Sequence, residues 1–371
     1  MFESSGRTEL AKAFGPDLGD GPWFVADSKE EATLQIQQLM AQKGLKHLKF
    51  DVVQDEDVLD TWFSSGLLPL SALGWTGPSS GQLPARYPTN LIETGTDIMF
   101  FWVARMVMLC SHLSGQVPFK DIMFHAMVRD AQGRKMSKSV GNVIDPTHVI
   151  EGISLEDLKA TLEGGNLAQK EVKRSQAAME KDFPHGIKAS GADALRFTLV
   201  SATQHTRQIN LDLSNVTSAQ HFANKLWNLS NFSQTRFDDA EFSTTVGADT
   251  VVAQGLAAKR SGDISLVERY IMSRLADTVS KVNQGMLDLE PSVATDTVRK
   301  FVIQDLCDVY VEFCKPTLFS TQEDALKKES MLMVLQTCLD ASLRMLHPFM
   351  PFVTEVSDNH STVFIRCIIK V

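Results

Sequence analysis

The sequence of 371 residues predicts an α/β region built on parallel strands, followed by an all-α helical bundle. Two observations lead to this prediction. In the first half, apolar runs of strand length alternate with glycine turns and helical stretches, which is the order typical of a parallel sheet. In the last third, apolar residues recur at spacings of three and four, as they do on the core face of a bundled helix.

The composition limits the kinds of function that fit. With 43% apolar residues, the chain has enough material for two or three cores. The formal net charge of -9 excludes a generally basic nucleic-acid binder, so any RNA contact is expected to use local patches. The five cysteines form no C-x-x-C pair, which indicates reduced thiols in an intracellular protein and predicts no metal site.

The N-terminal part mixes charges with glycine and proline. Met1 to Gly21 has no apolar segment typical of a secretory signal. Helical spacing predicts a helix over Lys29 to Gly44, with the glycine as its end. Before it, Trp23 to Val25 is predicted to be a short strand.

An acidic run follows and leads into Asp60-Thr61-Trp62-Phe63-Ser64-Ser65. This order predicts a loop entering a helix. By residue type alone Trp62 is interpreted as a core residue, since large aromatic side chains are mostly buried.

Tyr87 to Cys110 has the pattern of a strand, a glycine turn and a helix. Gly95 allows a ligand to approach the backbone, and the carboxylate of Asp97 is suited to accept hydrogen bonds from ribose hydroxyls. The alternative for Asp97 is a helix N-cap. The longest apolar run, Ile98 to Cys110, contains Arg105 and is interpreted as too short to span a bilayer, so a buried helix is predicted.

Ile122 to Val128 is predicted to be a buried strand, and the turn after it carries Lys135 and Lys138. Lysines at the end of a parallel strand suit a polyphosphate, because they can compensate negative charge that moves onto a leaving group. The alternative is a solvated basic loop. Downstream, Asp145-Pro146 predicts the start of a helix.

The rest of the chain is predicted to be helical. Three short helices are expected between Ile150 and Ala189, and another begins at Gly191-Ala192-Asp193. After the polar stretch from Phe237 to Gly262, three amphipathic helices are expected. Their apolar stripes are Val267, Ile271, Leu275, Val279 and Val282; Val298, Phe301, Val302, Leu306, Val309 and Phe313; and Leu332, Leu335, Leu339, Leu343 and Leu346.

The run Lys135-Met136-Ser137-Lys138-Ser139, followed by Gly141-Asn142, resembles the K-M-S-K-S signature of class I aminoacyl-tRNA synthetases. From about Trp23 to Glu355 the chain resembles the valyl members, including the turn Asp182-Phe183-Pro184. The resemblance implies an incomplete Rossmann-like nucleotide-binding fold. It also implies ATP with Mg²⁺, valine and tRNA(Val) as substrates of a valine-tRNA ligase.

The resemblance further assigns roles to individual residues. Lys135 and Lys138 are expected to compensate the charge on departing pyrophosphate. Trp62 and Trp102 are expected to line the pocket for an aliphatic side chain, although core packing remains the alternative for Trp102. The residues expected to contact ATP are Gly95, Asp97, His125, Met127, Val128, Lys135, Met136 and Lys138.

Four segments are expected from the resemblance: residues 1–50 as a remnant of an inserted editing domain, 51–210 as the C-terminal half of the catalytic domain, 211–355 as the anticodon-binding domain, and 356–371 as an aberrant, strand-like tail. None of the nine histidines lies in the H-x-G-H element of the family, so this chain is not expected to act alone. The alternatives are a fragment of an isoleucyl enzyme and an inactive tRNA-binding module. The expected location is the cytoplasm, with a mitochondrion or another organelle as the alternative, and no membrane partner is expected.

Overall fold

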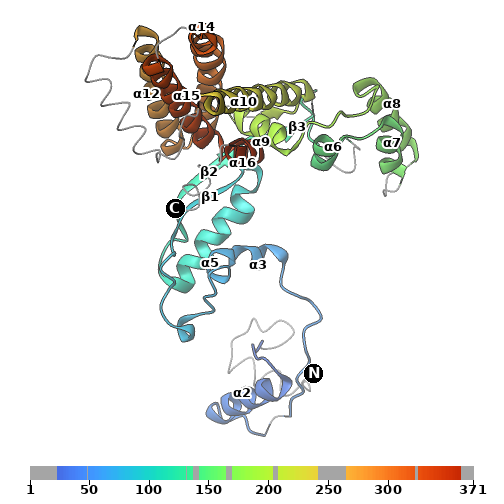
Figure 1. Ribbon diagram of the computed structural model, residues 1–371. Helices are drawn as coiled ribbons and strands as arrows, with labels where there is room; N and C mark the ends of the chain where they lie inside the picture. Colours follow the sequence, from blue (N-terminus) through green and yellow to red (C-terminus); the bar gives the residue numbers. More distant parts are fainter. Residues whose placement is uncertain are drawn as a thin grey trace. The chain divides into compact units, whose positions relative to one another are not determined.

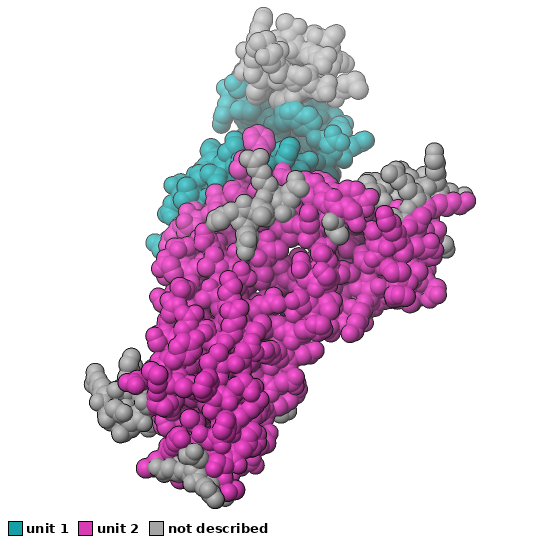
Figure 2. Space-filling view, turned by 90° about the horizontal axis from the view of Figure 1, so that it is seen from above, with its two compact units in different colours: residues 1–88, 101–118 teal, residues 89–100, 119–371 magenta. Residues whose placement is uncertain are grey.

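The computed structural model describes residues 23–47, 49–130, 132–136, 142–163, 169–203, 208–240, 265–321 and 325–360. The chain forms two compact units, which Figure 2 draws in different colours: Met1–Pro88 with Phe101–Pro118, and Thr89–Phe100 with Phe119–Val371. The four segments expected from the sequence remain a prediction about domain boundaries, since the compact units group residues by contact.

The first unit contains short helices and a small core. Helix α2 (Lys29–Gln42) begins at Ser28, whose side chain accepts a hydrogen bond from the backbone N–H of Glu31, which confirms the predicted helix. The strand predicted over Trp23 to Val25 is wrong, because this segment has no regular structure and Val25 is exposed. The other helices are α3 (Thr61–Gly66), α4 (Leu68–Ser71), the 3-10 helix η1 (Pro78–Ser80) and α5 (Arg105–Ser114). The core consists of Leu70, Trp75, Tyr87 and Cys110.

The long apolar run is less buried than predicted. It forms the π-helix η3 (Met99–Ala104) and then α5. Val103, Met106 and Cys110 are buried at helical spacing, but Met108 is 70% exposed, so the predicted full burial is wrong. The prediction about length is also wrong. The 19-residue helical stretch Thr96–Ser114 is long and apolar enough to cross a membrane, although one such helix is weak grounds for a membrane role.

The second unit contains two small parallel sheets (Figure 1). Strand β1 (Thr89–Gly95) pairs with β2 (Phe119–His125), and β3 (Met127–Arg129) pairs with β4 (Gln208–Asn210). The strand predicted over Ile122 to Val128 is therefore two strands in two sheets, divided at Ala126. The predicted burial is also wrong, because Ile122 is 41% exposed and the other residues are only half-buried. The parallel α/β arrangement itself is confirmed.

Short helices lie between β3 and β4 in the chain, and the helix predicted to start at Asp145-Pro146 is confirmed. Helix α6 (Pro146–Glu151) begins at Asp145, whose carboxylate accepts a hydrogen bond from the backbone N–H of Thr147 at 2.8 Å. The others are α7 (Leu155–Glu163), α8 (Gln169–Asp182) and α9 (Ala192–Ser201), so the described residues contain two of the three helices predicted between Ile150 and Ala189. The 3-10 helix η2 (Thr96–Ile98) follows β1 earlier in the chain.

The last third is the predicted helical bundle (Figure 1). Its helices are α10 (Leu213–Asp239), α12 (Leu266–Leu287), α13 (Pro291–Lys300), the π-helix η4 (Phe301–Val311), α14 (Glu312–Phe319), α15 (Ala325–Leu346) and α16 (Pro351–His360). One hydrophobic core runs from Val149 on α6 through the bundle, and Ile271, Leu306 and Leu335 are fully buried in it. The predicted apolar stripes thus form most of the core. The prediction is wrong for Phe313, which is 61% exposed, and Val309 is only half-buried.

The end of the bundle differs from the prediction. Helix α16 continues through Val356 to His360, so a strand-like tail starting at Val356 is wrong, and residues 361–371 lie outside the described part of the chain. The first turn of α16 is held by Asp193 on α9. Its carboxylate accepts hydrogen bonds from the backbone N–H groups of Phe352 at 3.3 Å and Val353 at 2.6 Å.

Candidate functional site

The carboxyl ends of β1 and β2 bring together four of the predicted nucleotide residues. Gly95 and His125 are register partners at the ends of the two strands. A Cβ atom at Gly95 would lie 2.7 Å from Sδ of Met127 and 2.9 Å from Oδ1 of Asp97, so only glycine fits without a shift. Ligands of open parallel sheets bind outside such strand ends.

Asp97 lies inside the 3-10 helix η2, and Gly95 occupies the N-cap position. The alternative that Asp97 is an N-cap is therefore wrong. Its carboxylate is exposed beside Gly95, which is the arrangement that a ribose contact requires.

His125 and Val128 have different environments. Nε2 of His125 lies 3.1 Å from Oε1 of Glu93, and Nδ1 lies 3.0 Å from the carbonyl oxygen of Ala126. Both ring nitrogens thus lie close to a protein oxygen, and the neutral ring can donate to one of the two. The side chain of Val128 packs against the main hydrophobic core, so only its backbone is suited to a ligand contact.

The segment that we name the lysine loop, residues 130–142, follows β3, and the structure describes residues 130, 132–136 and 142 of it. Lys135 pairs with Arg129 in an antiparallel bridge, and its side chain is exposed. Gly133 has a positive φ of 76°, which favours glycine at this turn. Met136 is half-buried, and Lys138 lies outside the described residues.

Asp130, at the start of the lysine loop, is only 5% exposed. Its carboxylate accepts hydrogen bonds from the backbone N–H of Arg134 at 2.7 Å, from Nε of Arg134 at 2.7 Å and from Nδ2 of Asn142 at 3.0 Å. Burial raises the pKa of Asp130, but the hydrogen bonds from Asn142 and Arg134 outweigh it and hold the pKa below its ordinary value. No sequence pattern assigned a role to Asp130 beyond its place in the turn after the predicted strand.

The two predicted pocket tryptophans belong to the first unit. The backbone N–H of Trp62 donates to Asp60, the N-cap of α3, at 2.6 Å, so the predicted loop-to-helix entry is confirmed. The ring of Trp62 lies 6.0 Å from that of Phe101, a neighbour that the sequence did not indicate. Nε1 of Trp102 donates to the carbonyl of Ser65 at 3.1 Å, which leaves the ring faces of this half-buried side chain for other contacts.

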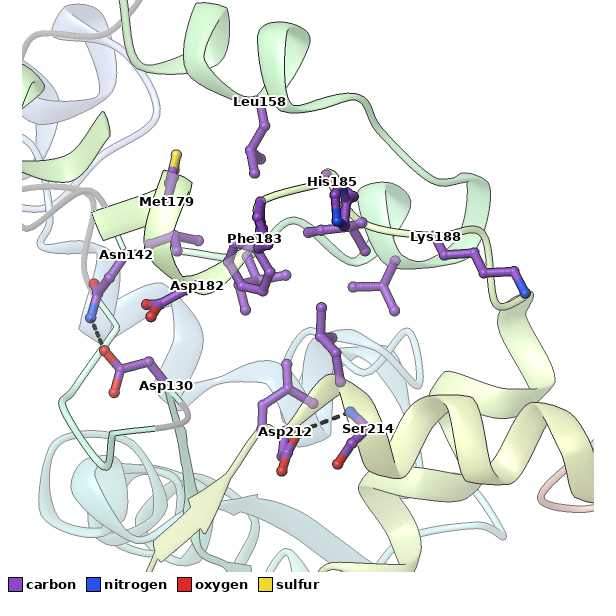
Figure 3. A pocket seen from close by; sticks show the side chains of 18 of the residues that line it. Asp130, Asn142, Leu158, Met179, Asp182, Phe183, His185, Lys188, Asp212 and Ser214 are labelled. Carbon is purple, nitrogen blue, oxygen red and sulfur yellow. Dashed lines mark hydrogen bonds between the residues drawn. The ribbon is translucent and has the colours of Figure 1, made fainter. Parts of the chain in front are cut away.

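A cavity of about 750 Å³ lies in the second unit, beside the base of the lysine loop (Figure 3). Figure 3 shows Asp130 and Asn142 pointing toward one another at this cavity. Nε2 of Gln132 lies 3.4 Å from both carboxylate oxygens of Asp182, which connects the loop to the end of α8. The apolar lining includes Val149, Leu158, Met179, Phe183, Ile187 and Leu211. Gly95 and Asp97 are not among the lining residues, so this cavity is distinct from the strand-end site.

Comparison with known families gives two matches along the chain. The family described as tRNA synthetases class I (I, L, M and V) matches residues 20–212. The anticodon-binding domain of tRNA ligase matches residues 268–357.

Several valine-tRNA ligases are similar in sequence. The enzyme of Mus musculus is 44% identical over 91% of this chain and 25% of its own length. That of Schizosaccharomyces pombe is 44% identical over 93% of this chain and 34% of its own length. The mitochondrial enzyme of Saccharomyces cerevisiae is 42% identical over 91% and 29%. The chain thus spans between 25% and 34% of the length of these relatives.

Two solved structures show the same fold at low identity. Mycobacterium tuberculosis methionyl-tRNA synthetase bound by methionyl-adenylate matches 95% of this chain and 61% of its own, with a TM-score of 0.55 and 16% identity. The Agrobacterium radiobacter K84 LeuRS complex with tRNA and LeuAMS matches 84% of this chain and 33% of its own, with a TM-score of 0.53 and 18% identity.

Proposed function

Because this chain belongs to the class I tRNA synthetases of the I, L, M and V group, we propose that it is part of a valine-tRNA ligase. In this proposal the chain contributes ATP contacts and the anticodon-binding helices for tRNA(Val). The choice of valine is supported by relatives that are 42% to 44% identical. The chain is not expected to be active alone, because it spans only part of those relatives.

The proposed reaction is activation of valine. The carboxylate of valine attacks the α-phosphorus of ATP, the bond from this phosphorus to the oxygen bridging the α- and β-phosphates breaks, and pyrophosphate leaves. Mg²⁺, which the family uses with ATP, would enter with the nucleotide substrate and would neutralise phosphate charge. Lys135 and Lys138 compensate the charge on pyrophosphate. A carboxylate that is already ionised at neutral pH needs no general base, so positioning and electrostatics supply most of the acceleration. The valyl group then passes to a ribose hydroxyl of tRNA(Val).

The observation that supports ATP binding best is the crowding at the strand ends. A Cβ atom at Gly95 would require the side-chain ends of Met127 and Asp97 to shift, so both side chains lie directly beside this glycine. Asp97 then supplies the ribose contact, and the backbone of His125, Met127 and Val128 supplies the adenine contact. Trp62 and Trp102 line the pocket for the valine side chain.

The test is ATP binding to the whole chain by calorimetry, in the presence of Mg²⁺. Asp97→Ala is expected to weaken binding by about tenfold, since it removes a charge-assisted contact. Asp121→Ala is the matched control, because Asp121 is an exposed carboxylate on β2, away from the strand end. Equal affinity of the Asp97 variant and the unmodified chain contradicts the proposed site.

A second function, a tRNA-binding module without catalysis, is favoured by the separate match of residues 268–357. Two assays distinguish the two functions: valine-driven exchange of pyrophosphate into ATP, and a gel shift with tRNA(Val). A gel shift without any exchange favours the binding module. Exchange driven by isoleucine in place of valine indicates an isoleucyl enzyme. The names of some relatives place them in mitochondria, and for this chain a cytoplasmic or mitochondrial location stays a prediction.

A further inference from the structure

The carboxylate of Asp130, at the base of the lysine loop, accepts hydrogen bonds at both of its oxygens. Oδ1 of Asp130 accepts hydrogen bonds from the backbone N–H groups of Gln132 at 3.1 Å and Arg134 at 2.7 Å. Oδ2 accepts from Nε of Arg134 at 2.7 Å and from Nδ2 of Asn142 at 3.0 Å. Each oxygen thus faces two donors, an arrangement that favours the ionised carboxylate, which only accepts hydrogen bonds.

Asn142 connects this carboxylate to Lys135. Its Nδ2 donates to Oδ2 of Asp130 and also lies 3.2 Å from the carbonyl oxygen of Lys135. The backbone N–H of Asp130 in turn donates to the carbonyl of Arg134 at 3.1 Å. The backbone at Lys135 is therefore held on both sides, while its side chain remains exposed.

We propose that Asp130 and Asn142 are positioning residues for the polyphosphate site, because they hold the backbone from which Lys135 reaches a phosphate. This inference rests on the function proposed above. A lysine whose backbone is held in advance loses less conformational freedom on binding, so the ligand binds more tightly. Neither residue needs to contact the phosphate itself.

The contacts of Asp130 all lie close to it in the chain. Their loss is therefore expected to change the lysine loop without changing the stability of the whole fold. All four donors lie within the lysine loop, between Gln132 and Asn142. An amide at position 130 would turn an NH₂ group toward two of these donors and open the loop base. The helical core, which begins at Val149, does not include Asp130, so its stability should change little.

The experiment measures binding of inorganic pyrophosphate with Mg²⁺ to the whole chain by calorimetry. Asp130→Asn is expected to weaken pyrophosphate binding by about tenfold, because the side chain of Lys135 is then no longer held in place for the phosphate. Asn142→Ala, which removes one donor, is expected to weaken it by roughly threefold. Lys135→Ala tests the binding group itself. The matched control is Asp145→Asn, since Asp145 is an exposed carboxylate that caps α6 three residues after Asn142.

Two further readouts distinguish positioning from damage to the fold. Binding of adenosine, which carries no phosphate, is expected to be unchanged in Asp130→Asn, and the melting temperature is expected to stay within about 2 °C. Hydrogen exchange at the amides of Gln132 and Arg134 is expected to become faster in this variant but not in Asp145→Asn.

The outcomes separate the two proposals. If Lys135→Ala weakens pyrophosphate binding while Asp130→Asn and Asn142→Ala bind as the unmodified chain does, positioning is disproved and the proposed function stands. If the unmodified chain does not bind pyrophosphate, the proposed function fails and the positioning role falls with it. Equal losses of adenosine and pyrophosphate affinity in Asp130→Asn also overturn positioning, because they indicate general damage.

Discussion

Asp130 in the lysine loop and Asp193 on α9 are both buried carboxylates that accept backbone N–H groups, but they connect very different parts of the chain. Asp130 binds donors at most twelve residues away. Asp193 binds the first turn of α16, 159 and 160 residues away. The same chemistry therefore shapes a loop in one region and joins α9 to α16 in the other. When the donors lie close in sequence, loss of the carboxylate is expected to disturb only a loop. When they lie far apart, its loss is expected to lower the free energy of unfolding of the whole unit.

The largest effect is expected at the junction between α9 and α16. Asp193→Ala leaves the N–H groups of Phe352 and Val353 without their carboxylate and removes a negative charge from the start of a helix. The free energy of unfolding is expected to fall by about 3 kcal/mol. Urea unfolding followed by circular dichroism measures this change.

The matched control is Asp288→Ala, an exposed carboxylate at the end of α12 that accepts hydrogen bonds only from Gln284 among the described contacts. Its free energy of unfolding is expected to change by about 0.5 kcal/mol or less. If the two variants unfold at the same urea concentration, the global role of Asp193 is disproved.

A smaller effect is expected from Arg196, which lies on the same helix as Asp193. Its guanidinium donates to the carbonyl oxygens of Pro348 at 3.0 Å and Phe349 at 3.3 Å, just before α16 begins. Arg196 is exposed, so water can replace these contacts. Arg196→Ala is expected to lower the free energy of unfolding by about 1 kcal/mol, measured in the same urea experiment.

Arg196→Lys sharpens this comparison, because lysine keeps the charge but cannot donate to both carbonyls in a fixed planar geometry. If charge alone matters, the lysine variant is as stable as the unmodified chain. If the paired hydrogen bonds matter, it loses nearly as much as the alanine variant, and this second result is the expected one.

The sequence was sufficient where the signal is local. The helix start at Asp145, the glycine turn at Gly95 and the apolar stripes of the bundle depend on neighbours within a few residues, and the structure has each of them. It was not sufficient for the two carboxylates, because a hydrogen bond between Asp193 and Val353 leaves no spacing pattern in the chain.

The apolar run after Asp97 shows the same limit. The apolar periodicity identifies a helix, but tertiary packing decides which of its sides are buried. Here Met108 stays exposed. The break at Ala126 between β2 and β3 is likewise set by pairing with two different strands. The roles of Lys135, Asp97 and the two tryptophans remain predictions, because they concern ligands.

The smallest effect is expected in the pH dependence of the lysine loop. The pKa of Asp130 is lowered in the folded chain, so the carboxylate stabilises the loop fully above the ordinary value of 3.8 and loses this contribution as the pH falls through the folded-state pKa. Hydrogen exchange at the amide of Arg134 is therefore expected to stay slow, relative to the intrinsic rate, down to about pH 4. Below that it should quicken while the bundle stays folded. In Asp130→Asn the same amide should be fast throughout, without a transition. If exchange in the unmodified chain instead quickens near neutral pH, a group other than Asp130 controls the order of the loop. Asp130 then does not shape the loop as Asp193 joins α9 to α16.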